Sequence, residues 1–158
     1  MSGATELSNF LKQKGLMQPI CFIGSHVQAL PIETLQKEKS IDLVFTNEGV
    51  YALKNLLKEN SSFNEYHKIK GIAFRDINNN IKMNLPEKIV PQDKMDTDLP
   101  GYAWDLLPFK NKPFDLYKAP MWHAEYNAEN RSPYAAIQTS LGCQFGCNFC
   151  MINIINRN

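Results

Sequence analysis

Residues 41–46 have the sequence IDLVFT, and this short run indicates how the first half of the chain folds. It lacks the polar–apolar alternation of a strand with one wet face, so we predict a strand that is buried on both faces. Residues 19–23 (PICFI) and 70–75 (KGIAFR) are apolar runs of the same kind. The first half of the chain is therefore expected to contain three buried strands.

Helical patterns precede and separate these runs. Residues 4–14 carry apolar side chains at helical spacing, and we expect the face that contains Leu7 and Leu11 to be buried. Residues 31–39 begin with a proline, which the first turn of a helix tolerates. A further helix is predicted over residues 48–58, and its expected inward face consists of Val50, Leu53, Leu56 and Leu57.

The order of these elements predicts an α/β fold. Strands that alternate with helices and are apolar throughout are typical of a parallel sheet covered by helices, so we expect a partial Rossmann-like layer. Three asparagines at residues 78–80 supply a turn, after which residues 81–83 are predicted to return as a hairpin strand.

The composition changes after residue 84. Seven of the nine prolines lie within residues 86–133, which argues against long regular elements there. The same stretch holds seven aromatic residues, which is too much apolar surface for a flexible linker. It is either an ordered strap that packs across a neighbouring domain or an irregular subdomain that packs on itself. We predict three regions: 1–84, a strap over 85–133, and 134–158.

Composition and charge exclude some classes of function. The chain is 44% apolar and 21% charged, as globular proteins are, and its net charge of +1 includes no basic block. Nothing therefore indicates a nucleic-acid partner or an anionic membrane surface. No stretch approaches the roughly 18 apolar residues of a membrane span, and the first residues lack the pattern of a secretory signal. We expect a cytoplasmic protein.

The clustered cysteines are the strongest chemical signal. Cys143, Cys147 and Cys150 lie within eight residues, and glycines before the first and second allow tight turns. Such clustering indicates a metal or redox site more than a disulfide framework. Zinc, an iron–sulfur cluster with one open iron, and unliganded thiols all remain possible on spacing alone. Cys21 is expected to be a small core residue and a poor fourth ligand.

The cysteine loop resembles that of the radical S-adenosylmethionine (SAM) superfamily. The resemblance rests on CxxxCxxC after a predicted strand over residues 134–140, with the aromatic Phe149 just before the third cysteine. It implies that the three cysteines hold a [4Fe-4S] cluster whose unique iron binds SAM, and that Phe149 lies near the adenine. It also implies reductive cleavage of SAM to a 5′-deoxyadenosyl radical, with an electron donor such as flavodoxin or ferredoxin.

The upstream half is similar to the later half of a cobalamin-binding domain, which precedes the radical SAM barrel in one subfamily. The similar residues are FIGSH at 22–26, Leu-Pro at 30–31 and IDLVFTNEG at 41–49. In that family Gly24 and Ser25 would let the backbone approach the nucleotide tail of cobalamin, and Glu48 and Gly49 would form the next turn. Both turns follow strands, where ligands of open parallel sheets bind. His26 is expected to be a loop histidine that bonds locally.

The resemblance implies a fragment of a cobalamin-binding radical SAM enzyme. The first strand and the cluster loop of an incomplete (β/α) barrel are present, and the remaining barrel strands are expected beyond residue 158. We expect methyl transfer or cyclisation on a small-molecule or lipid-like substrate in the full-length enzyme, and an inactive chain when it is isolated. Two alternatives remain: a non-catalytic zinc- or iron–sulfur-binding module, and a Rossmann-like interaction domain without a cofactor.

Overall fold

The computed structural model describes residues 2–58, 63–106, 143, 145–150 and 152. By compactness the chain divides into two units, one of Met1–Lys94 with Gly142–Asn158 and the other of Met95–Leu141. Most of the predicted strap and the predicted strand over residues 134–140 lie outside the described residues. No helix in the described part of the chain is both long enough and apolar enough to cross a membrane.

The first unit contains a mixed sheet of four strands in the order β1-β2-β3-β4. The strands are β1 (Cys21–Phe22), β2 (Leu43–Phe45), β3 (Ile72–Arg75) and β4 (Ile81–Met83). β1 pairs with β2 in parallel, whereas β3 is antiparallel to β2 and to β4. The predicted hairpin of β3 and β4 is confirmed. The prediction of a wholly parallel sheet was wrong for β3.

The connection between β2 and β3 explains the reversed strand. It contains two elements, α4 (Val50–Lys58) and η1 (Phe63–Lys68), where a parallel crossover needs only one helix. The chain thereby returns to the edge at which β2 ends, and Thr46 N–H donates to the Gly71 carbonyl at 2.9 Å. Because β4 reverses again, the carboxyl ends of β1, β2 and β4 share one edge of the sheet.

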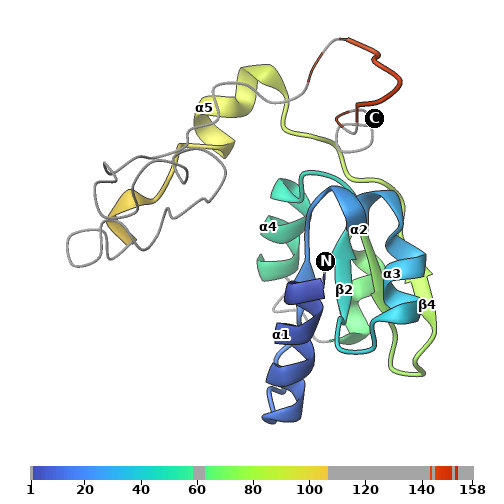
Figure 1. Cartoon of the computed structure of the whole chain (residues 1–158). Coiled ribbons are helices and arrows are strands. Elements are labelled where there is room, and N and C mark those ends of the chain that lie inside the picture. Colours follow the sequence, from blue (N-terminus) through green and yellow to red (C-terminus); the bar gives the residue numbers. More distant parts are fainter. Residues whose placement is uncertain (1, 59–62, 107–142, 144, 151, 153–158) are drawn as a thin grey trace, which may run out of the picture. The chain divides into compact units, whose positions relative to one another are not determined.

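Helices cover the central strands on both faces (Figure 1). Leu43 and Phe45 of β2 point into a core formed with α4 and η1, and Tyr66 meets Phe74 there edge-on at 5.6 Å. Val44 points to the opposite face, where α2 (Ser25–Ala29) and α3 (Pro31–Lys37) pack. Burial on both faces is why the run IDLVFT is apolar without alternation, as predicted.

The first helix, α1 (Ser2–Gln13), lies where it was predicted, but with another face inward. It buries Thr5 and Ser8, while Leu7 is 58% exposed. Ser8 Oγ lies 2.7 Å from Ser40 Oγ, and Lys12 Nζ lies 2.9 Å from the Asp42 carboxylate. These polar contacts orient the helix, so the expectation of a buried Leu7 face was wrong.

Two other burial predictions also failed. Leu53 and Leu57 of α4 are 44% and 70% exposed, because the helix faces the core through Ala52 and Leu56, one turn apart. Cys21 is exposed because β1 is an edge strand of only two residues. The run over residues 19–23 is therefore not a buried strand as a whole.

Candidate functional site

The candidate cofactor site is the edge at which β1, β2 and β4 end. Gly24 follows β1, and the Asn47–Glu48–Gly49 turn follows β2. A Cβ on Gly49 would lie only 2.6 Å from Ile23 Cδ1, so the two turns are in direct contact. The sequence prediction that the two turns share one edge is met, even though β3 runs against the predicted direction.

A cavity of about 840 Å³ opens at this edge. Its walls are the α2–α3 corner, the end of β2 and the residues that follow β4, with polar groups from Gln28, Asn47, Asn84 and Glu87. Its described lining includes acidic side chains and no basic one. Such a site suits an uncharged polar ligand with apolar surface better than an anion.

One side-chain oxygen beside the cavity has no hydrogen-bond partner among the described residues. The side-chain amide of Gln28 donates through Nε2 to the backbone carbonyl of Asn47. Its side-chain oxygen, Oε1, is buried and makes no hydrogen bond within the described residues. Buried polar atoms are almost always satisfied, so an unsatisfied acceptor next to a cavity calls for an explanation. A ligand donor or a water molecule could satisfy it.

The predicted glycine–serine turn is open to solvent on its backbone side. Gly24 has φ +129°, and no atom lies within 4 Å of where its Cβ would be. Ser25 begins α2 and is half-buried, and His26 is exposed in the same helix. The backbone of Gly24 is therefore free for the close approach of another molecule. None of these three residues lines the cavity itself.

The second predicted turn is occupied by contacts within the protein. Glu48 Oε1 accepts the Val90 N–H at 2.5 Å, and Asn47 Oδ1 accepts the Gly49 N–H at 2.9 Å. Gly49 is buried, with φ +79°, and its Cβ position is blocked by Ile23 and Phe45. Its glycine is explained by this conformation and packing, without reference to a ligand.

Sequence reasoning missed the polar residues of the cavity wall. Gln28, Asn47, Asn84 and Glu87 come from separate segments, and no spacing pattern connects them. Asn47 directly follows a predicted strand end, which is the one signal that could have identified it. Asn84 and Glu87 reach this edge through the β3–β4 hairpin, which carries residues 84–87 back to it, and Gln28 reaches it from α2.

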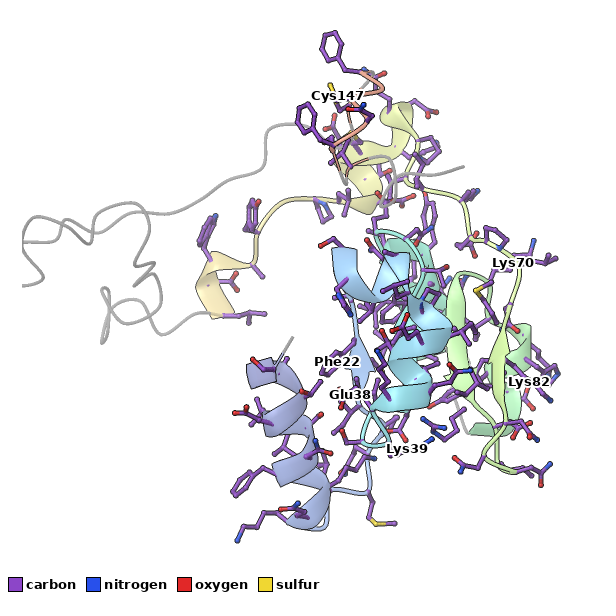
Figure 2. The ribbon with its side chains drawn as sticks, turned by 45° about the vertical axis from the view of Figure 1, so that its right-hand side comes forward. Phe22, Glu38, Lys39, Lys70, Lys82 and Cys147 are labelled. Carbon is purple, nitrogen blue, oxygen red and sulfur yellow. The ribbon has the colours of Figure 1, made fainter. Side chains whose placement is uncertain are left out.

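The cysteine loop presents its thiols outward. Cys143 and Cys147 are exposed and Cys150 is half-buried, and Cys150 N–H donates to the Cys147 carbonyl at 3.1 Å. Phe149 is 89% exposed. Figure 2 shows the described side chains of the loop, with Cys147 labelled. Nowhere in the described part of the chain do three Cys, His, Asp or Glu side chains converge as metal ligands would.

The fourth cysteine has a different environment. Although Cys21 is exposed, partial burial of its thiol, together with the nearby Asp42 carboxylate, raises the thiol pKa from 9.0 to about 11. The Lys12 ammonium opposes this shift. A thiol with so high a pKa is a poor metal ligand at neutral pH, because the ligand form is the thiolate.

Two curated relatives are similar over most of this chain. An uncharacterized methyltransferase of Pyrococcus horikoshii is 31% identical over 127 residues, which are 80% of this chain and 24% of the relative. An anaerobic magnesium-protoporphyrin IX monomethyl ester cyclase of Synechocystis is 27% identical over 118 residues, 75% of this chain and 20% of the relative. The chain thus spans about a quarter and a fifth of their lengths.

Neither family profiles nor solved structures extend these similarities. No protein-family profile matches the chain. Among solved structures, the cobalamin-dependent SAM radical enzyme OxsB, with aqua-cobalamin and SAM bound, is similar at 19% identity and a TM-score of 0.40. That match covers 60% of this chain and 14% of OxsB. A similarity of this size does not establish a common fold.

Proposed function

We propose that this chain belongs to the cobalamin-binding radical SAM superfamily and is the part of such an enzyme that holds the iron–sulfur cluster and borders cobalamin. The observation that carries the proposal is the CxxxCxxC loop in a chain that aligns with two enzymes over three quarters or more of its length. The activity belongs to the full-length protein.

The chemistry of the cysteine loop fits a [4Fe-4S] cluster. Cys143, Cys147 and Cys150 supply three soft thiolate ligands, which leave one iron of a cubane without a protein ligand. All three are at least partly exposed, so a cluster can reach them. They do not converge in the described structure, so we expect the loop to rearrange around the cluster as it binds.

Held by Cys143, Cys147 and Cys150, the cluster would supply a site for SAM and the electron for its reductive cleavage to methionine and a 5′-deoxyadenosyl radical. Phe149 is the residue of this loop that we assign to the adenine of SAM. Its ring is exposed, which leaves a face free for stacking. A flavodoxin or ferredoxin is the class of electron donor that we propose for the full-length enzyme.

The sheet edge fits part of a cobalamin. The exposed backbone of Gly24 and the start of α2 at Ser25 offer an unobstructed approach, and Glu48–Gly49 form the turn beside them. The cavity of about 840 Å³ has room for a heteroaromatic group, and the side-chain oxygen of Gln28 can accept a hydrogen bond from a hydroxyl or amide group of the same ligand. Cobalamin is therefore proposed as the ligand of this edge, with the uncharged base of its nucleotide tail in the cavity.

The names of the two relatives support a proposal for the reaction class. One is named a methyltransferase and the other a cyclase of a magnesium porphyrin ester. We propose methyl transfer or ring closure on a small or lipid-like substrate. A non-catalytic zinc module is the alternative, and the enzyme names of both relatives do not favour it.

Metal analysis after purification without oxygen tests the assignment. Iron together with acid-labile sulfide supports a cluster, and zinc without sulfide supports the module. A second test uses the full-length protein with SAM and a reductant. The proposal predicts 5′-deoxyadenosine, and its absence from a cluster-loaded, reduced enzyme with substrate would remove the catalytic assignment.

A further inference from the structure

Several hydrogen bonds hold the residues that follow β4 against the rest of the first unit. We call residues 84–90 the clasped segment. The side-chain Nδ2 of Asn84 donates to the backbone carbonyls of Tyr66 and Ile69, at 2.6 Å each. The backbone carbonyl of Leu85 accepts the Gly71 N–H at 2.8 Å. The start of the segment is thereby fixed against the loop that leads into β3.

The end of the clasped segment is held by the turn after β2. Asn47 Nδ2 donates to the Glu87 carbonyl at 2.8 Å, and Glu48 Oε1 accepts the Val90 N–H at 2.5 Å. Val90 is itself buried, with 6% of its surface exposed. A carboxylate that accepts a backbone N–H makes one of the stronger hydrogen bonds in proteins.

Glu87 lies between Leu85 and Val90 in the clasped segment, and its side chain makes further contacts. Its Cβ is 2.7 Å from where a Gly71 Cβ would be, and its carboxylate accepts the Asn55 amide at 3.2 Å. Asn84, Pro86 and Glu87 of the segment form one wall of the cavity. The geometry of that wall therefore depends on the contacts made by Asn47 and Glu48.

We propose that Asn47 and Glu48 are positioning residues that hold the clasped segment and so shape the cavity. Glu48 acts as a hydrogen-bond acceptor for Val90 and does not touch the bound molecule. Asn47 connects three segments, because its carbonyl also accepts the Gln28 amide at the opposite wall. The effect on cobalamin rests on the proposed function, whereas the clasp itself is a property of the fold.

The test compares Glu48→Gln with Glu48→Ala in the 158-residue chain. Glutamine keeps an acceptor oxygen at the same distance along the side chain, whereas alanine removes it. Hydrogen exchange of the Val90 amide in this chain, measured by NMR, reports the clasp directly. Aquacobalamin binding to the full-length protein with the same substitutions, followed by visible absorbance, reports the cavity. Glu6→Ala, which removes an exposed carboxylate from α1, is the matched control.

We expect the Val90 amide to exchange at least tenfold faster in Glu48→Ala, and within about threefold of the unchanged chain in Glu48→Gln. Aquacobalamin affinity should follow the same order, and Glu6→Ala should change neither quantity. Asn47→Asp, which keeps the acceptor for Gly49 N–H and loses the donor to Glu87, should weaken binding and lower the free energy of unfolding, because a buried carboxylate then faces the Glu87 carbonyl.

Two results would overturn the proposal. One is an unprotected Val90 amide in the unchanged chain, which would mean that the clasp is not formed. The other is a Glu48→Gln variant that loses cobalamin while Val90 stays protected, which would make Glu48 a direct ligand. If the unchanged full-length protein binds no cobalamin but Val90 protection follows the predicted order, the clasp stands and the cofactor assignment fails.

Discussion

The sheet edge and the cysteine loop differ in how their polar groups are used. At the edge, Asn47 and Glu48 are already hydrogen-bonded to backbone groups and Gly49 is packed against Ile23. In the loop, Cys143 and Cys147 are exposed and the three thiols do not converge. The contacts at the edge are formed in the protein alone, whereas the thiols of the loop are at least partly exposed and are not brought together.

This difference separates two kinds of mutational effect. Substitutions at the edge should cost free energy of unfolding, because they break contacts that exist in the protein alone. Substitutions in the loop should reduce the amount of bound metal and leave the stability of the sheet unchanged. The following predictions test or refine that contrast.

The largest effect is expected for the three cysteines. Alanine at Cys143, Cys147 or Cys150 should abolish formation of a stable cluster, because a cubane held by two protein thiolates is not expected to persist. Absorbance near 400 nm and bound iron after anaerobic reconstitution measure this. Cys21→Ala is the control and should retain the cluster. A cysteine variant that kept its full iron content would remove that residue from the ligand set.

Cys21 offers a second contrast among the cysteines. With its thiol pKa at about 11, the thiolate fraction near pH 8 is about one hundredth of that of an ordinary thiol of pKa 9.0. In a chain with the other three cysteines replaced by alanine, alkylation by iodoacetamide should be about 100-fold slower than for a model thiol. The rate should rise about tenfold per pH unit until pH reaches about 11. A rate that levels off near pH 9 would contradict the raised pKa.

Gly49→Ala should be the most costly substitution at the edge. An alanine here would have to adopt φ +79°, and its Cβ would lie 2.6 Å from Ile23 Cδ1. We therefore expect a loss of about 2 kcal/mol in the free energy of unfolding. Urea unfolding measures it. Gly3→Ala in α1, where the Cβ meets nothing within 4 Å, is the control and should not destabilise the chain. Cluster loading should be equal in both variants.

The smallest effect is expected in the β3–β4 turn, away from both regions. The Asn80 backbone N–H and then the Lys82 ammonium lower the pKa of Asp76 below 3.8. A lowered folded-state pKa stabilises the fold above pH 3.8, and that contribution is lost as pH falls through the folded value. Asp76→Asn should therefore lower the melting temperature slightly at pH 7. The gap should close toward pH 2, and a gap that widened there would contradict the shift.

Local sequence patterns predicted most of the elements. Helices were expected over residues 4–14, 31–39 and 48–58, and α1, α3 and α4 lie there because helix spacing and end signals act locally. The direction of β3 was not predicted, because it depends on how many elements connect it to β2. The buried face of α1 was also not predictable, because it is set by Ser40 and Asp42, which are distant in sequence.

The candidate site was predictable only in part. The cysteine spacing and the turns after β1 and β2 are continuous in sequence, so they could be identified there. The cavity wall could not, because Asn84 and Glu87 reach it through the β3–β4 hairpin. The structural role of Glu48 was hidden for the same reason, since its partner Val90 is 42 residues away.

The most direct test of the central claim is an iron and sulfide count on the reconstituted chain before and after mild oxidation. Three cysteine ligands predict about four irons and four sulfides per chain, followed by loss of one iron to give a three-iron cluster with its own EPR signal. Zinc without sulfide, or a cluster that keeps all four irons under oxidation, would contradict the assignment of an open iron to this loop.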